Sequence, residues 1–484
     1  MKSILFFDRE ELTDFFILLT QAIGERMRIF HVAYTEEDAI KLRNAGIIDY
    51  YHYGQHVSEK FHSEHLDSEL LDQIDILMIE NSNGRFNLNS SIQSDRGFSL
   101  LSYSEALLSA QVHYQCWNEI FNRFGKIDYL LHEPCSLYFN HIAALLCKAQ
   151  GGIYIWHALT HADFDGDTYL NINNDDYSSI EIKTYFERYL HNPDSIDYER
   201  CKKFVSDFRN DFTVLLAGVM SKKESKLQLL YRAWREKIGN FVKYRQYDRL
   251  CNNIEYWMHT LSYWGDKVRN LKDYKKDKII FEEPQEGEDY YYYSFHLEPE
   301  SVVLYLGDGI YANQVKLIEN IAASLPPKTY LYVKDHPHEL AYRCSNDYLR
   351  LMKVPNIRLI RQTIPGKMLI KNAIGVFTIN GTAGFEALVL GKQVYYFGWN
   401  YNCYYPKVNY IRNIRDLRDI IYKNRGKQYE DDVMFYAYIN AFLDAAHPGF
   451  INYFMGLADK CCKDPVANAQ VVADDLVKYC NTVW

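Results

Sequence analysis

The sequence predicts an α/β protein made of two Rossmann-like domains that face a cleft, with a helical insertion between them and C-terminal helices. Short apolar segments alternate with amphipathic helical segments in both halves, and a charged helical stretch separates the halves. Apolar runs without polar alternation are typical of strands that are covered on both faces. Their alternation with helices predicts doubly wound parallel sheets. A length of 484 residues is comfortable for two such domains.

The first predicted domain spans residues 1–178. Its expected strands are 4–7, 27–33, 74–79, 129–131 and 153–156, and its expected helices are 10–23, 103–124 and 139–150. Residues 80–97 are polar and follow a predicted strand. We therefore expect them to form a long loop at the sheet edge where such proteins place their sites.

Residues 179–284 predict a charged helical insertion that ends in an acidic, proline-containing linker. Within it, Lys222–Arg249 carries nine Lys or Arg against three acidic residues, and apolar residues recur there at helical spacing. One interpretation is an amphipathic helix that packs on the core with a solvated face. The other is a surface that contacts anionic lipid of the inner membrane or an anionic acceptor glycan.

The second predicted domain spans residues 285–425, and C-terminal helices that pack back on the domains occupy 426–484. Its expected strands are 290–295, 302–306, 329–333, 357–360, 374–379 and 394–397. Helices are expected at 314–325, 346–352, 366–372, 382–390 and 417–424, and beyond the domain at 433–446 and 467–480.

Composition narrows the class of protein. The net charge of −9 argues against broad nucleic-acid binding, which requires a basic footprint. The N-terminus is too quickly polar for a signal peptide, and no apolar run approaches the ~20 residues of a membrane helix. The ten cysteines lack Cys-x-x-Cys spacing, which predicts reduced thiols in a cytoplasmic protein. A phosphate loop, a Gly-x-Ser-x-Gly elbow and a His-Glu-x-x-His pair are all absent from the sequence.

The stretch from Asn380 to Ala387 predicts a ligand site at the start of a helix. Gly381 permits a sharp turn after a buried strand, and Thr382 is expected to cap the helix and leave its first amides facing a ligand. Such a helix start attracts phosphate. Glu386 lies one turn later on the same face, where a carboxylate accepts hydrogen bonds from sugar hydroxyls. This pairing predicts a nucleotide-sugar site.

A second stretch, Leu331-Tyr-Val-Lys-Asp-His-Pro-His338, ends another buried strand. Lys334 and His336 point to the same side because strand side chains alternate, and Pro337 stops the strand at its carboxyl edge. A histidine there is suited to donate a hydrogen bond to a phosphate oxygen. The alternative is a histidine that caps the following turn.

Four stretches of the second half occur in a recognisable order: Tyr293-Ser-Phe-His-Leu-Glu-Pro-Glu300, Asn313-Gln314, Tyr332-Val-Lys-Asp-His-Pro337, and Asn380-Gly-Thr-Ala-Gly-Phe-Glu-Ala387 with Gly391-Lys392. Together they resemble bacterial capsule and surface-polysaccharide glycosyltransferases of the GT-B fold. The likeness is greatest to 3-deoxy-manno-octulosonic acid (Kdo) transferases, which use CMP-activated donors. It covers residues 290–400, about a quarter of the chain.

The resemblance implies a role for each matching residue. Lys334, His336 and Pro337 would lie at the donor phosphate, with Gly381, Thr382 and Ala383 binding it from the helix start and Glu386 holding the ribose. His296, Glu298, Glu300 and Gln314 would shape the donor sugar pocket, although Glu298 and Glu300 also suit plain loop carboxylates. No cofactor or metal is expected beyond the CMP-linked donor.

Glycosyl transfer requires a carboxylate that deprotonates the acceptor or acts as nucleophile. We expect it in the first half, at a strand's carboxyl end. Glu133 fits best, and Asp95, beside Arg96 in the polar loop, is second. Either residue also suits a loop position satisfied by backbone amides.

The run His157-x-x-x-His161-Ala-Asp163-Phe-Asp165-Gly-Asp167 invites a metal interpretation. A calcium loop requires Gly after its third acid and Glu at its twelfth position, whereas these places hold Thr168 and Asn174. The alternatives are an acidic surface loop, a contact of Asp163 and Asp165 with the acceptor, and a diphosphate-bound Mn²⁺ or Mg²⁺.

The sequence thus predicts a cytoplasmic glycosyltransferase, peripheral at the inner membrane through Lys222–Arg249 or wholly soluble, with a nucleotide-sugar donor and a glycan or glycolipid acceptor. Two other classes remain open. One is a sugar-nucleotide epimerase, or a transferase for another nucleotide sugar, on the same scaffold. The other is a non-catalytic partner in polysaccharide assembly.

Overall fold

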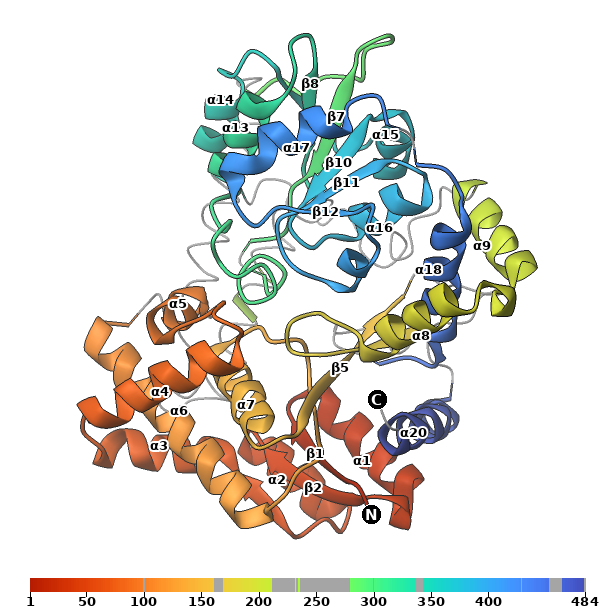
Figure 1. Cartoon of the computed structure of the whole chain (residues 1–484). Helices are drawn as coiled ribbons and strands as arrows, with labels where there is room; N and C mark the ends of the chain where they lie inside the picture. Colours follow the sequence, from red (N-terminus) through yellow and green to blue (C-terminus); the bar gives the residue numbers. More distant parts are fainter. Residues whose placement is uncertain are drawn as a thin grey trace. The chain divides into compact units, whose positions relative to one another are not determined.

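The computed structural model describes residues 1–98, 101–160, 169–210, 231, 234–235, 279–298, 300–336, 343–427, 429–451 and 464–482. These residues divide into two compact units, one from 1–187 with 441–482 and one from 188–440. Each unit contains a largely parallel sheet covered by helices (Figure 1). The predicted α/β class with two Rossmann-like units is confirmed.

The first unit has a seven-stranded sheet of order β13-β6-β5-β4-β1-β2-β3. Its parallel strands are β1 (Ser3–Asp8), β2 (Arg28–Ala33), β3 (Tyr50–His52), β4 (Tyr129–Leu131) and β5 (Ile153–Leu159). Strands β6 (Tyr169–Asn173) and β13 (His447–Pro448) continue the sheet in antiparallel pairs. The strand order reverses between β1 and β4, which makes the gap between their carboxyl ends the topological switch point of this sheet.

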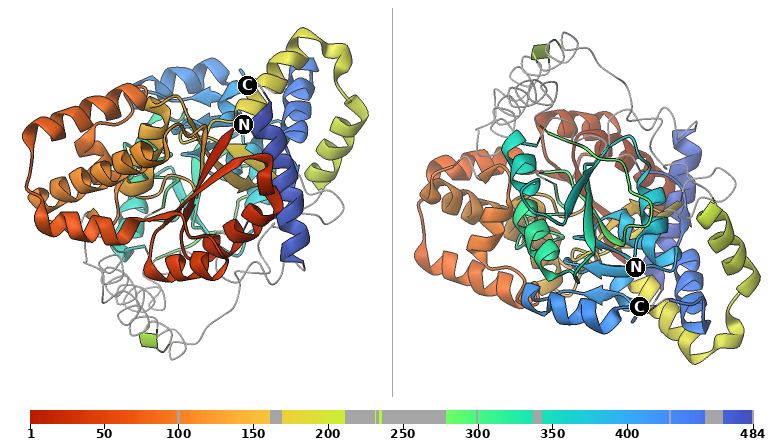
Figure 2. Two further views of the ribbon diagram at one scale, coloured as in Figure 1. Left: turned by 90° about the horizontal axis from the view of Figure 1, so that it is seen from below. Right: turned by 90° about the horizontal axis from the view of Figure 1, so that it is seen from above.

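Side-chain alternation along β1 explains how helices cover both faces of this sheet. Ile4 and Phe6 join a core with α1 (Glu11–Ile23) and α20 (Pro465–Asn481). Phe7 points the other way and packs on Tyr53 and Trp117. These belong to α3 (Tyr53–Ser63) and α6 (Tyr103–Phe124), which lie with α7 (Tyr138–Ala149) on that face. Figure 2 shows the dark-blue helix α20 alongside the red helix α1.

The second unit has a six-stranded, fully parallel sheet of order β12-β11-β10-β7-β8-β9. Its strands are β7 (Tyr290–Ser294), β8 (Tyr330–Lys334), β9 (Ile357–Ile360), β10 (Gly375–Thr378), β11 (Gln393–Tyr396) and β12 (Asn409–Tyr410). Its switch point lies between β7 and β10. The surrounding helices are α13 (Gln314–Ser324), α14 (Ser345–Leu351), α15 (Gly366–Asn372), α16 (Thr382–Val389) and α17 (Leu417–Asn424).

The four tyrosines of β7 alternate between the two faces of the sheet, as side chains of a strand do. Tyr291 and Tyr293 are buried in the core with α13 and α17. The hydroxyl of Tyr290 donates a hydrogen bond to the carbonyl of Leu369 in α15, and the hydroxyl of Tyr292 lies beside Gly366 of the same helix.

Two predicted strands are wrong. Residues 74–79 belong to α4 (Ser68–Asn81), where Ile74 and Met78 are buried one turn apart while Ile76 and Ile79 are exposed. A short apolar run does not separate a strand from one face of a helix. Residues 302–306 form consecutive turns that lead to Asp308, which has a positive φ of 62°. The expected polar loop at 80–97 contains a short helix, α5 (Leu88–Ser94).

Among the described residues, further helices are α2 (Glu36–Asn44), α8 (Ile180–His191), α9 (Tyr198–Asn210) and α18 (Val433–Asp444). The basic stretch Lys222–Arg249 lies outside the described residues except for positions 231, 234 and 235, and Tyr231 and Trp234 are exposed. Both interpretations of this stretch stay predictions. In the part of the chain that the structure describes, none of the helices has the length and apolarity needed to cross a bilayer.

Candidate functional site

His296 bridges the switch point of the second sheet. It follows β7, and its Nε2 accepts the backbone N–H of Ile379, at the end of β10, at 3.0 Å. The hydroxyl of Thr378 lies 3.2 Å from the same nitrogen. Burial lowers the pKa of His296 to about 3, and the nearby charges of His336 and Arg343 act in the same direction. The ring is therefore neutral, and its single proton lies on Nδ1.

Gly381 is required by the close approach of His296 rather than by a left-handed turn. Its φ is −77°, and a Cβ at this position would lie 2.7 Å from Cε1 of His296 and 3.3 Å from Nδ1. The tip of the histidine ring thus stands directly against the start of α16.

The predicted cap of α16 is wrong. The N-cap residue is Gly381, and no side chain caps the helix. Thr382 is instead the first helical residue and is exposed, with Ala383 half-buried beside it. The hydroxyl of Thr378 accepts the N–H of Gly381 at 2.9 Å. The first turn of α16 therefore presents its amides without competition from a capping side chain, which is the feature that an anion requires.

Lys334 brings a buried positive charge to the same sheet edge. The residue is 5% exposed, and its ammonium has no hydrogen bond or ion pair with any described residue. Burial lowers its pKa, and the negative charges of Asp335 and Glu386 oppose that effect. An ammonium in this state is stabilised by an anionic ligand.

Glu386 is half-buried on α16, within electrostatic reach of Lys334. Burial raises the pKa of Glu386 to about 7, against the opposing charges of Lys367 and Lys334. The carboxyl group therefore changes its charge near neutral pH. The structure brings Lys334, His296, Gly381 and Glu386 to one edge of the sheet. Their predicted roles at a donor nucleotide stay predictions.

The predicted sugar-pocket residues Gln314 and Glu298 are held by protein groups. The oxygen of Gln314 accepts the hydroxyl of Tyr293 and the N–H of His296, both at 2.9 Å. Its amide donates to the carbonyl of His296 and to Glu298. All four hydrogen-bonding positions of this amide are used. Gln314 thus positions the segment that follows β7, and Glu300 is half-buried in the turn beyond it.

Arg343, which the sequence motifs did not indicate, joins the segments after β7 and β8. Its guanidinium stacks on Phe295 at 3.7 Å, donates to Glu298 at 3.1 Å and has its Nε 3.7 Å from Asp335. Tyr348 donates to the other oxygen of Asp335, and burial raises the pKa of Asp335 to about 6. These contacts fix the chain next to His336, which is half-buried and whose carbonyl accepts the amide of Gln362 at 2.6 Å. Pro337 lies outside the described residues.

Glu133 stands at the switch point of the first sheet, directly after β4. Its Oε1 accepts from Nη1 of Arg9, which follows β1, at 2.6 Å and from the hydroxyl of Ser136 at 3.2 Å. His132 lies 3.7 Å from the same oxygen. Burial opposes ionisation, but Arg9, His132 and Arg96 together hold the pKa of Glu133 below its usual value. The residue is an ionised carboxylate with a side chain that is 21% exposed.

Asp95 fits the structural alternative that its sequence left open. It is 4% exposed, and its two oxygens accept the backbone N–H groups of Gly97, Phe98 and Tyr138 at 2.6, 3.0 and 2.6 Å. Burial raises its pKa, with the three amides opposing. Its carboxylate ties the loop to the start of α7, while Arg96 is half-buried within electrostatic reach of Glu133. Asp163 and Asp165 lie outside the described residues. Where the structure does describe the chain, no cluster of metal-binding side chains is found.

These features define an α/β protein whose second unit has a buried lysine and a helix start without a side-chain cap at one sheet edge. Residues 219–445, a little under half of the chain, match the family described as "Capsule polysaccharide biosynthesis protein". The match spans the stretches 331–338 and 380–387 and confirms the resemblance to capsule proteins. Comparison with curated proteins gives no match.

Several solved structures are similar at low identity. A β-Kdo 2,7 transferase, KpsC of Thermosulfurimonas dismutans, is 14% identical, with a TM-score of 0.33 over 75% of this chain and 89% of that one. UDP-GlcNAc 2-epimerase of Neisseria meningitidis is 10% identical, with a TM-score of 0.27 over 99% and 100%. The rhamnosyltransferase SpnG is 11% identical, with a TM-score of 0.27 over 92% and 95%.

Proposed function

We propose that this protein is a glycosyltransferase of bacterial surface-polysaccharide assembly. It moves a sugar, a ulosonic acid such as Kdo or a nonulosonic acid, from a CMP-linked donor to a polysaccharide or glycolipid acceptor. The observation that carries the proposal is the unpaired, 5% exposed Lys334 at the sheet edge where α16 begins without a side-chain cap. A buried cation and free helix amides together suit a nucleotide phosphate.

The protein groups supply the charge that stabilises the departing nucleotide, so the proposed reaction needs no metal. Lys334, the α16 amides and Nδ1–H of His296 surround the phosphate, and His336 contacts it from the tip of β8. Glu386 accepts hydrogen bonds from the ribose hydroxyls. The acceptor oxygen attacks the anomeric carbon, the bond from that carbon to the phosphate oxygen breaks, and CMP leaves. The acceptor proton passes to a carboxylate of the first unit, for which Glu133 is the predicted candidate.

A thermal-shift panel tests the nucleotide site directly. CMP should raise Tm of the wild-type protein, and at ~100 times its dissociation constant the stabilisation should reach roughly 2.7 kcal/mol. Lys334→Met and His336→Ala should each lose most of this shift. Lys353→Met, which removes an exposed lysine of the same unit, serves as the matched control.

The panel also separates the other classes. No shift with CMP, UDP or GDP would contradict the proposal and favour a non-catalytic partner. A shift with UDP alone, together with an epimer formed from donor without acceptor, would instead favour an epimerase.

A further inference from the structure

An open cavity of about 560 Å³ lies beside β12, the edge strand of the second sheet. Strands β11 and β10 separate this β12 cavity from the switch point, so it is distinct from the sheet edge that holds Lys334. Its volume is within the range of roughly 300–1,000 Å³ that is typical of ligand sites. Its walls come from β12, from α17 and from the segments before β12 and after α17, and they include Lys407, Tyr410, Lys423, Lys427 and Tyr429.

The lining of the β12 cavity is basic. None of the described residues in its walls is acidic, and Lys407 pairs with Asp432, outside the walls, at 2.6 Å. The ammonium of Lys423 makes no hydrogen bond or ion pair with any described residue. That of Lys427 contacts only the amide oxygen of Asn424, at 3.3 Å, within the same described part of the chain. Two lysines therefore keep a positive charge that no described carboxylate neutralises, in a chain whose net charge is −9.

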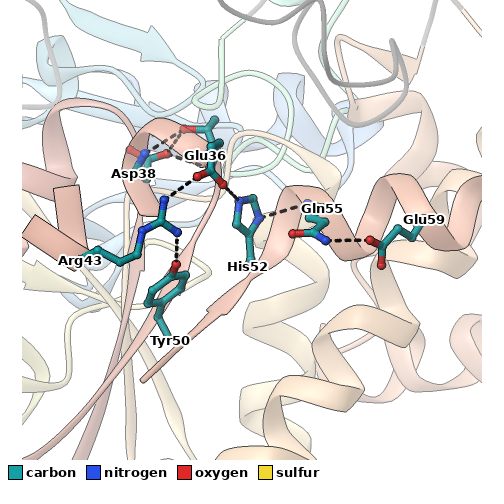
Figure 3. A network of polar contacts seen from close by, with 8 residues as sticks. Glu36, Asp38, Arg43, Tyr50, His52, Gln55 and Glu59 are labelled. Atoms are coloured by element: carbon teal, nitrogen blue, oxygen red, sulfur yellow. Dashed lines mark hydrogen bonds and ion pairs between the residues drawn. The ribbon is translucent and has the colours of Figure 1, made fainter. Parts of the chain in front are cut away.

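The edge strand of the first sheet shows the opposite treatment of a basic side chain. Figure 3 shows Arg43 of α2 between Glu36 and Tyr50, with both contacts 2.6 Å long. Glu36 also pairs with His52 at 2.8 Å. Because Tyr50 and His52 belong to β3, the charge of Arg43 ties a helix to the edge of its sheet. The two lysines of the β12 cavity make no contact of this kind with the described residues.

The end of α17 does not account for these lysines. The helix dipole favours a cation near a C-terminus, but none of the described carbonyl groups accepts a hydrogen bond from the ammonium of Lys423. Gln393 of β11 instead donates to the carbonyls of Asn424 and Lys427, at 2.7 and 3.1 Å. The side chain of Asn424 donates to Asn409 of β12 at 2.8 Å. These bonds fix the wall of the cavity and leave the ammonium groups available.

Two tyrosines add an aromatic surface to the same cavity. Tyr410 and Tyr429 are half-buried in its walls. A tyrosine combines an apolar ring face with a polar hydroxyl, and this combination suits the apolar faces and hydroxyls of a sugar ring. A carboxylate or a phosphate would satisfy the lysine charges alone. The aromatic walls favour an anionic group that is carried by a sugar.

We propose that the β12 cavity is a second saccharide site, which binds an acidic oligosaccharide. The carboxylates of the saccharide pair with Lys423 and Lys427, and its sugar rings lie on Tyr410 and Tyr429. The choice of an acidic saccharide rests on the proposed function, because ulosonic acids carry carboxylates into the polymer. Binding itself requires neither donor nor reaction, so the site is tested without either.

The test is titration calorimetry with a tetramer of N-acetylneuraminic acid, without nucleotide and at low salt. The wild-type protein should bind the tetramer, with an affinity that falls as salt rises. The double variant Lys423→Gln/Lys427→Gln should bind roughly tenfold more weakly or not at all, because both charge pairs are lost. Tyr429→Leu should also weaken binding. Maltotetraose, which is uncharged, and inorganic phosphate should each bind the wild-type protein more weakly than the tetramer.

A matched control removes the same charge elsewhere on the second unit. Lys353→Gln/Lys371→Gln replaces two exposed lysines and should bind the tetramer as the wild-type protein does. Equal binding by the cavity variant and the wild-type protein, or equal loss in both double variants, would overturn the β12 cavity as the site. Phosphate that binds as tightly as the tetramer would overturn its assignment to a saccharide.

The CMP-induced shift in Tm separates this inference from the proposed transfer. The cavity variant should keep the wild-type CMP shift, because the β12 cavity and the start of α16 lie at different places on the sheet. Absence of tetramer binding with a normal CMP shift would overturn the saccharide site alone. Absence of a CMP shift with normal tetramer binding would overturn the proposed donor site alone.

Discussion

The central strands of the two units follow the same order, but different chemistry bridges their switch points. In the second unit a neutral ring, His296, accepts a backbone N–H across the gap between β7 and β10. In the first unit a charged pair, Arg9 and Glu133, crosses the gap between β1 and β4. A neutral bridge does not neutralise the local positive charge of Lys334 and the α16 amides, which the proposed donor phosphate would use. A charged bridge holds the Glu133 carboxylate ionised between Arg9 and Ser136.

Breaking the charged bridge should have the largest effect on stability. Arg9→Met leaves the ionised carboxylate of Glu133 without its main partner and removes stacking on Tyr34 and Phe139. Loss of a buried pair costs about 3–5 kcal/mol, and partial exposure of Glu133 reduces this to roughly 2–4 kcal/mol. Urea unfolding measures the change. The CMP-induced shift should survive, since it arises in the other unit. Equal loss in Arg9→Lys would show that planar stacking, rather than charge, holds this bridge.

Added side-chain volume at the neutral bridge should disturb the proposed donor site directly. A methyl group in Gly381→Ala would lie 2.7 Å from the ring of His296, so either the ring or α16 must move. We expect a cost of about 1–3 kcal/mol and a weaker CMP shift. Gly366→Ala is the matched control, because its added carbon would meet the hydroxyl of Tyr292 at an ordinary 3.4 Å. An unchanged CMP shift in Gly381→Ala would contradict the placement of phosphate at the start of α16.

The two bridges should respond to acid in different pH ranges. The folded-state pKa of His296 is lowered to about 3. As pH falls below about 6.5, His296 is therefore protonated in the unfolded chain but stays neutral in the folded chain. Its contribution to stability is therefore lost progressively from about pH 6.5 downward. The pKa of Glu133 is also lowered, but its contribution is lost only below the usual carboxylate range. A His296→Phe variant should reduce the dependence of Tm on pH between 4 and 6.5. Part of the slope should remain, because burial also lowers the pKa of His113, His132, His141 and His157. A wild-type slope in that variant would exclude His296 as its source.

The sequence predicted the arrangement of residues at the sheet edge of the second unit better than at that of the first unit, for physical reasons. The positions of Lys334 and Glu386 follow from strand alternation and helical spacing, which are local rules that can be applied to the sequence alone. The bond between Arg9 and Glu133 joins residues 124 positions apart, and no local pattern indicates it. Asp95 was a candidate because it is an acidic residue in a polar loop. Its carboxylate instead accepts the backbone N–H of Tyr138, a contact between residues distant in sequence that only the fold brings together. The cap at Thr382 was misplaced by one residue because Gly381 already has extended backbone geometry.

Substitution of Glu386 should have the smallest effect of these changes, and the effect should be confined to the pH dependence of CMP binding. Burial raises its pKa to about 7, so the carboxylate that would accept from the ribose hydroxyls is ionised above that pH and protonated below it. Hydrogen bonds to an ionised acceptor are roughly twice as strong as neutral ones. CMP should therefore bind more tightly than 2′-deoxy-CMP at pH 8, with the difference shrinking at pH 6. Titration calorimetry at both pH values measures this difference, and Glu386→Gln should remove its pH dependence. If the wild-type protein shows the same CMP preference at both pH values, Glu386 does not contact the ribose, and the donor site is defined by its phosphate contacts alone.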